Sequence, residues 1–163
     1  MKYVKNILAS LVITVFVISC DKGGDPDPGG TAVEQMAGDW YVKYLVNGVD
    51  VGNGYNLLST YNTSANVSTE MWVDNHNLSL SPLKVKANSN IGNLTFSGTD
   101  LENIAGINLT TTIHEGKVLK NVATTSGGNT SDSIYFQFES ITNPGVIYVV
   151  GGYKRTGFAE DEH

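Results

Sequence analysis

The chain has 163 residues and a net charge of −6, from 10 basic and 16 acidic side chains, and it contains one cysteine. An acidic surface without a basic stripe repels phosphate backbones, which excludes nucleic acid as a partner. A single cysteine excludes an internal disulfide bond, so Cys20 indicates some other use.

The first nineteen residues are typical of an export signal, in which a positive start precedes an apolar run and a small residue. Lys2 and Lys5 supply the charge, the run covers residues 7–18, and Ser19 ends the segment. The run is shorter than the about 20 apolar residues that a membrane-spanning helix needs. We therefore expect residues 1–19 to be removed as a signal peptide.

Cys20 ends the segment "VISC", which resembles the lipobox of bacterial lipoproteins. The resemblance implies that Cys20 becomes the new N-terminus and carries a diacylglycerol and an amide-linked acyl chain, a durable membrane anchor. The alternative is an ordinary secretory signal with an unused cysteine. Residues 20–30 alternate charge with Gly and Pro, which predicts a flexible tether. The acids after the anchor resemble surface-export signals of Bacteroidetes lipoproteins, which implies an outer-membrane protein on the periplasmic or surface face of the cell envelope.

Residues 31–163 predict a single all-β domain. Helical periodicity is almost absent, while short runs rich in Val, Ile, Tyr, Phe and Thr alternate with turn signals. One helical turn, residues 31–37, is expected before the first strand. We expect strands over the ranges 40–46, 55–61, 67–73, 83–87, 94–98, 107–113, 118–122, 133–139 and 146–155.

Three turns in this pattern carry the residues that tight turns require. Asn47-Gly48 and Glu115-Gly116 offer the positive φ of a hairpin, and Pro144-Gly145 turns the chain before the last strand. Consecutive hairpins produce an up-and-down meander, and a meander removes its open edges by closing into a barrel. The predicted fold is therefore an antiparallel up-and-down barrel of eight to nine strands.

Alternating side chains indicate which surface faces the core. Two strands have clear apolar faces, made of Ile134, Phe136 and Phe138 and of Ile107, Leu109 and Ile113. Alternation also directs a further set inward, namely Tyr61, Met71, Val85, Phe96, Phe136 and Tyr148. This set either lines a cavity for a small hydrophobic ligand or simply fills the barrel.

Trp40 stands at the head of the first strand, and closure of the barrel pairs this strand with the last one. Trp40 is then expected beside Arg155, whose guanidinium can stack on indole and donate to carbonyls of the preceding turn. This combination resembles the calycin superfamily, which includes the lipocalins. There a Gly-x-Trp motif opens the first strand and a basic residue near the last strand covers the ring, and Gly38, Trp40 and Arg155 match.

Nearly the whole domain resembles a Bacteroidetes lipoprotein family described as "lipid-binding putative hydrolases", with a lipocalin-like barrel. The similar segments are GDWYVKYLVNG, YNLLSTYNTS, MWVD, LKVKAN, TTSGGNTSDSIYFQFE and GGYKRTGF. The resemblance implies a cell-envelope protein whose partner is a lipid or another small hydrophobic molecule.

Motifs for covalent chemistry are sparse, since the chain has neither a Gly-x-Ser-x-Gly elbow nor a His-Glu-x-x-His motif. We expect no cofactor and no metal. His163 is expected to be disordered, and His114 is expected at the end of a hairpin. Asp74 and His76 stand two residues apart and could form a base with its orienting carboxylate, or two metal ligands. The neighbouring asparagines favour the alternative, a polar turn.

Two more patterns leave alternatives open. Glu70, Trp72 and Asp74 share a strand face, which fits either glycoside chemistry or an ordinary polar outer surface. Asp132-Ser133 before an apolar residue resembles a Bacteroidetes O-glycosylation site at Ser133, against a plain serine at the start of a strand.

Three classes of function are therefore open. The first is a lipid-anchored barrel that binds a hydrophobic molecule without covalent chemistry. The second is an esterase-like or glycan-active hydrolase that uses Asp74 and His76 or the acids near Trp72. The third is a structural or accessory subunit that works through envelope protein partners.

Overall fold

The computed structural model describes residues 30–163. The signal peptide, the anchor at Cys20 and nearly all of the tether, predicted above, lie outside the described residues. Residues Thr31–His163 form one compact unit. Within the described part of the chain, no helix has the length and apolar character of a membrane span.

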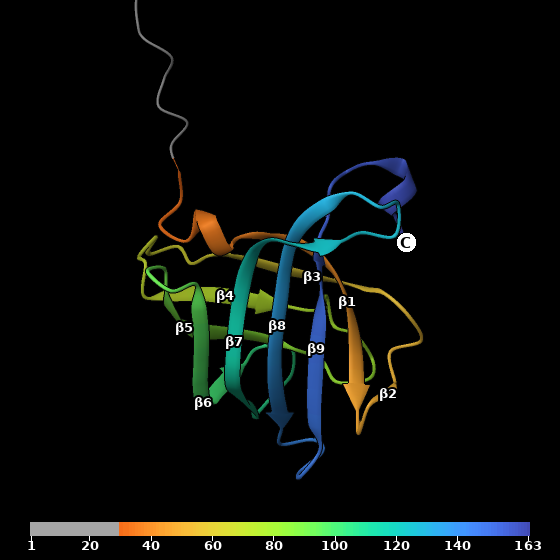
Figure 1. Ribbon diagram of the computed structural model, residues 1–163. Coiled ribbons are helices and arrows are strands. Elements are labelled where there is room, and N and C mark those ends of the chain that lie inside the picture. The colour runs from red at the N-terminus through yellow and green to blue at the C-terminus, as the bar shows by residue number, and fades with distance from the viewer. Residues whose placement is uncertain (1–29) are drawn as a thin grey trace, which may run out of the picture. The chain divides into compact units, whose positions relative to one another are not determined.

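Nine antiparallel strands form one sheet, and two single 3-10 turns, η1 (Glu34–Met36) and η2 (Ala159–Asp161), flank it. The strands are β1 (Gly38–Val46), β2 (Val49–Asp50), β3 (Asn56–Asn62), β4 (Glu70–Asp74), β5 (Lys84–Asn90), β6 (Thr95–Asn103), β7 (Leu109–Thr124), β8 (Thr130–Ser140) and β9 (Ile147–Lys154). Each long strand pairs with its neighbour in sequence, and β9 pairs with β1 (Figure 1). The result is a closed up-and-down barrel of eight strands, with β2 as a short extra strand beside the end of β1, so the predicted all-β barrel is confirmed.

The seam between β1 and β9 runs from Trp40 opposite Lys154 to Leu45 opposite Val149. Closure removes the edges that would otherwise expose unpaired backbone groups. Gly152 lies opposite Val42, and a Cβ atom at Gly152 would lie 1.9 Å from the carbonyl oxygen of Tyr41. The seam therefore depends on a glycine that lets the two backbones approach closely.

The hairpin predicted at Glu115-Gly116 is wrong, because these residues lie inside the single long strand β7. The ladder to β8 shifts register between Ile113 and Glu115, and His114 occupies the shift, so His114 is not at a hairpin end. A Cβ atom at Gly116 would lie 2.5 Å from the ring of Phe96. This glycine serves a close approach of a ring to the backbone, and not a turn.

Two other expectations about strands also change. The strand predicted from Val67 begins only at Glu70, because the chain makes a further turn at residues 68–69 before the strand starts. Ile107 was expected on an apolar strand face but precedes β7 and is 90% exposed, while Thr111 takes the buried position that continues the alternation of Leu109 and Ile113.

The turns at Asn47-Gly48 and Pro144-Gly145 are confirmed. Asn47 and Gly48 have φ values of 50° and 79° between paired Val46 and Val49, as a tight hairpin requires. Gly145 has a φ of 79° just before β9.

The barrel interior holds one continuous hydrophobic core. Its largest fully buried side chains come from β1, β3, β4, β7 and β8, from η1 and from the segments before η1 and β5: Trp40, Tyr44, Phe136, Phe138, Met36, Leu58, Met71, Leu83, Ile113, Ile134, Val33 and Val42. The predicted inward face of β8 is confirmed by burial of Ile134, Phe136 and Phe138. Side chains of this size fill the inside of an eight-stranded barrel.

Candidate functional site

Five of the six side chains expected to line a cavity belong to this packed core. Met71, Val85, Phe96, Phe136 and Tyr148 are buried in it. The aromatic members form a chain of contacts, with ring centroids 5.7 Å apart for Phe96 and Phe136, and further contacts reach Tyr148 through Phe138. They therefore pack against one another in the interior.

Tyr61 was expected inside the barrel and lies on its outer face. Leu58 and Thr60 of β3 point inward, so the period of two turns Tyr61 outward. Its hydroxyl donates to Oδ2 of Asp74 at 2.9 Å, and Lys84 lies over its ring.

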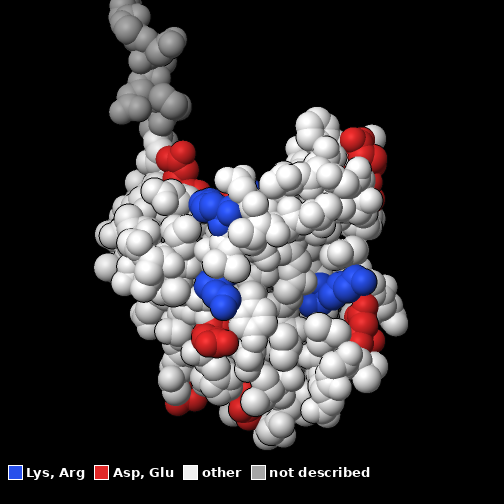
Figure 2. Space-filling model, viewed as in Figure 1, with Lys and Arg blue, Asp and Glu red and all other residues white. Residues whose placement is uncertain are grey.

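A surface hollow of about 180 Å³ lies over strands β6, β7 and β8. It is lined by Thr95, Phe96, Ser97, His114, Glu115, Gly116, Lys117 and Tyr135, from β6, β7 and β8. Phe96 and Gly116 lie opposite each other on β6 and β7, and the buried ring of Phe96 packs against the Gly116 backbone beneath the hollow. Around it, charged side chains are scattered over a mostly uncharged face (Figure 2).

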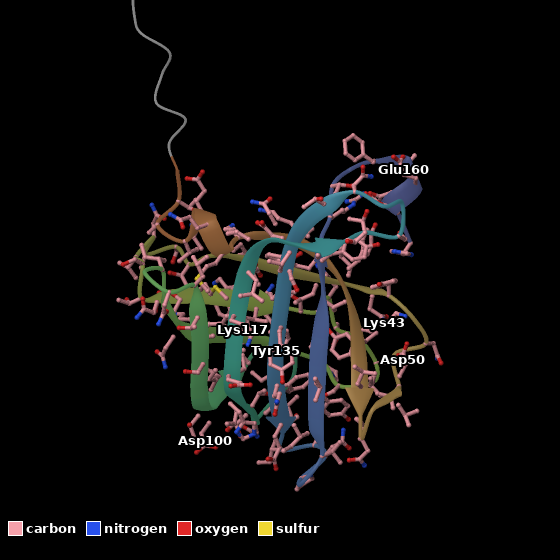
Figure 3. The ribbon with its side chains drawn as sticks, in the orientation of Figure 1. Lys43, Asp50, Asp100, Lys117, Tyr135 and Glu160 are labelled. Atoms are coloured by element: carbon pink, nitrogen blue, oxygen red, sulfur yellow. The ribbon has the colours of Figure 1, made fainter. Side chains whose placement is uncertain are left out.

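Lys117 and Tyr135 form one side of this hollow and project from adjacent strands (Figure 3). Nζ of Lys117 lies 5.4 Å from the ring centroid of Tyr135, a cation–π contact. The Tyr135 hydroxyl oxygen accepts a hydrogen bond from Nε2 of Gln137, which leaves its own proton free to donate. The hollow thus combines an apolar floor with a rim of polar donors, as ligand sites do.

Glu115, Glu139 and His114 are the other ionisable side chains at or beside the hollow. Glu115 lines it, and Nε2 of His114 lies 3.8 Å from Oε2 of Glu139. Lys117 forms no ion pair within 4.0 Å in the part of the chain that the structure describes. Sequence reasoning missed this site because the false hairpin at Glu115-Gly116 hid the neighbourhood of Lys117 and Tyr135.

A second polar cluster crosses the outer face of the first strands. Asp39, Ser59, Asp74 and Lys84 lie directly opposite one another on β1, β3, β4 and β5. Facing residues on neighbouring strands interact through their side chains. Asp39 and Ser59 could not have been found from local motifs, because the barrel register brings them to Asp74.

Asp74 and His76 form the predicted turn. Oδ1 of Asp74 accepts the backbone N–H of His76 at 2.9 Å, and His76 has a φ of 54°. Burial by itself would raise the pKa of Asp74, but hydrogen bonds from Lys84, the His76 backbone and Tyr61 lower it below its ordinary value. Asp74 is therefore held as a carboxylate by three donors.

The ring of His76 reaches Ser59, a contact that the sequence did not predict. Oγ of Ser59 lies 2.8 Å from Nε2 of His76 and donates to Oδ1 of Asp39 at 2.5 Å. A serine hydroxyl has one proton, so while Asp39 accepts it, Nε2 of His76 must be the donor to Ser59. In this arrangement His76 is not poised as a base toward Ser59. A hollow beside the cluster is lined by Asp74, His76, Asn77, Lys84 and Ala105.

Trp40 is fully buried, and its Nε1 donates to Oγ1 of Thr60 at 2.8 Å. The expected cover by Arg155 is wrong. Lys154 lies over the indole at 5.8 Å and donates to the carbonyl of Ala37 in the preceding turn at 2.9 Å. Arg155 lies instead over the ring of Tyr41.

Gly38 matches the motif and lies close to the side chain of Lys154. A Cβ atom at this position would lie 2.5 Å from Cε of Lys154, the side chain that covers the indole.

Trp72 lies on the outer face beneath Lys86, and Glu70 accepts from Oγ1 of Thr63. Ser133 lies within β8 and its hydroxyl donates to the carbonyl of Gly152 at 3.0 Å, so its glycosylation stays a prediction.

His163 was expected to be disordered, and instead it stacks on Tyr55 with ring centroids 4.3 Å apart. Among the described residues, no group of three or more His, Cys, Asp or Glu is placed to hold a metal.

These observations define an all-β protein with a closed, lipocalin-like eight-stranded barrel, a packed core and a hollow on its outer surface. A family model described as "lipid-binding putative hydrolase" matches residues 25–159. The chain belongs to this family. A comparison with curated proteins found no match.

Proposed function

We propose that this protein is a cell-envelope lipoprotein, anchored through Cys20, that binds the apolar part of a lipid without covalent chemistry. The observation that carries the proposal is the hollow between β6, β7 and β8, whose lining is mostly apolar and includes Phe96. The family description supports it, since it names lipid binding.

The size of the hollow sets how much of a lipid it holds. Sites that enclose a drug-sized ligand measure roughly 300–1,000 Å³, and this hollow measures about 180 Å³. It therefore holds a segment of an acyl chain, while the rest of the ligand stays at the surface.

Displacement of a fluorescent fatty acid from the secreted Cys20→Ser protein tests the proposal without detergent. Ser97→Tyr places a ring in the hollow, and we expect it to weaken probe binding about tenfold or more. Thr69→Tyr, at an exposed position outside the hollow, is the control. The proposal fails if the parent binds no lipid probe, or if both variants bind the probe as the parent does.

A second candidate is an esterase-like hydrolase, which the contacts of Ser59 with His76 and Asp39 favour. Against it, Ser59 is only 8% exposed and does not line the hollow beside the cluster. Turnover of a panel of acyl esters distinguishes the hydrolase from the binding protein. Turnover that disappears in Ser59→Ala and His76→Ala, with the fold intact, would favour the hydrolase, and equal rates in parent and variants would remove it.

A further inference from the structure

We propose that the ligand of the Phe96 hollow is a long-chain carboxylate, whose headgroup binds the Lys117 ammonium and the Tyr135 hydroxyl. This inference rests on the proposed function, because it names the lipid class for the same site. The geometry points to an anionic headgroup beside an apolar floor.

Lys117 is the cation of the proposed headgroup site. Most other basic side chains of the barrel are occupied: Lys84 pairs with Asp74, Lys86 with Glu70, Lys120 with Asp132 and Arg155 with Glu162, while Lys154 binds the Ala37 carbonyl. Lys117 has no acidic partner among the described residues and lines the hollow together with Phe96 and Tyr135. A charge-assisted hydrogen bond from its ammonium is stronger than a neutral one.

The Tyr135 hydroxyl supplies the second donor. Its oxygen already accepts from Gln137, so its proton is free to donate to a ligand. Lys117 lies over the same ring, which places ammonium and hydroxyl on one side of the hollow. Two donors match the two oxygens of one carboxylate.

Glu115 limits the charge that the site tolerates. Its carboxylate lines the same hollow and repels an anion, and this repulsion doubles for a dianionic phosphate. A headgroup with one negative charge therefore fits better than a phosphate. Removing this repulsion should strengthen carboxylate binding.

The test compares dodecanoate with dodecanol, which share a chain and differ in headgroup charge, as displacers of the fluorescent probe at pH 8. In the parent protein we expect dodecanoate to bind about tenfold more tightly than dodecanol. Lys117→Gln and Tyr135→Phe should each reduce this preference, and Glu115→Gln should increase it.

Lys43→Gln is the matched control. Lys43 lies on β1, away from the hollow (Figure 3), and like Lys117 it lies over a tyrosine ring, that of Tyr55. The inference is overturned if the parent binds acid and alcohol equally, or if Lys43→Gln reduces the preference as much as Lys117→Gln. Either result leaves the proposed function standing, whereas failure of both displacers to bind overturns the proposed function itself.

Discussion

At the scale of single residues, one position along a strand decides which ring a basic side chain covers. Trp40 faces Lys154 across the seam, so both side chains lie on the same face of the sheet. Arg155 follows Lys154 and lies over Tyr41 on the other face. The motif located the cation near the end of the last strand, but only the register determines its face.

Replacing the two cations separately tests this assignment. Lys154→Ala should lower the free energy of unfolding by about 1–2 kcal/mol, because the indole loses its cation and the Ala37 carbonyl loses its donor. Arg155→Ala should change the free energy of unfolding less, because its ion pair with Glu162 and its contact with Tyr41 are partly exposed to solvent. Urea unfolding monitored by tryptophan fluorescence measures both. A larger loss in Arg155→Ala than in Lys154→Ala would contradict the assignment.

At the scale of the elements, the seam between β1 and β9 is the contact that turns a meander into a barrel. Gly152 and Gly151 are adjacent on β9 and differ sharply in surroundings. A Cβ atom at Gly152 would overlap the Tyr41 backbone at 1.9 Å, whereas at Gly151 the nearest atom, the carbonyl oxygen of Ile134, would be 3.9 Å away.

We therefore expect Gly152→Ala to destabilise the protein strongly and Gly151→Ala to change stability little, within about 0.5 kcal/mol. In Gly152→Ala the two strands must separate, which breaks several ladder bonds of the seam at once. Thermal unfolding and hydrogen exchange of the β1 and β9 amides measure the effect. Equal melting temperatures for the two variants would show that the seam tolerates a side chain there.

Turn residues located most of the strands correctly, but they failed at β7, where Gly116 was interpreted as a turn. A glycine marks either a turn or a close approach, and the local sequence at Gly116 does not distinguish them. At Gly116 the close approach is to the ring of Phe96, which lies on another strand, β6. The same limit explains why the hollow and the Ser59 contacts were missed, since each assembles residues from three strands or more.

At the scale of the whole molecule, residues 156–163 pack back onto the barrel. His163 joins Tyr41 and Tyr55 in an aromatic cluster, and Arg155 pairs with Glu162, which also accepts from the Tyr41 hydroxyl. These partners are distant in sequence, so the composition of residues 156–163 could not predict that this segment packs on the barrel.

Asp161 fastens this segment to the loop between β7 and β8. It is fully buried, and its carboxylate accepts from the backbone of Gly127 at 2.7 Å, from Asn129 and from Thr156. Burial by itself would raise the pKa of Asp161, but these hydrogen bonds and one from Thr125 lower it to about 2, from an ordinary 3.8.

Because the folded pKa lies below the unfolded one, the carboxylate stabilises the docked segment fully above about pH 4, and this contribution disappears as pH falls toward about 2. The amide proton of Gly127 reports the titration directly by NMR, and its shift should follow a pKa near 2. Asp161→Asn should be less stable than the parent at neutral pH and should lose less stability between pH 4 and pH 2, because the amide does not titrate. A Gly127 amide that titrates near 3.8, or the same acid sensitivity in both proteins, would mean that Asp161 does not hold the segment through its charge.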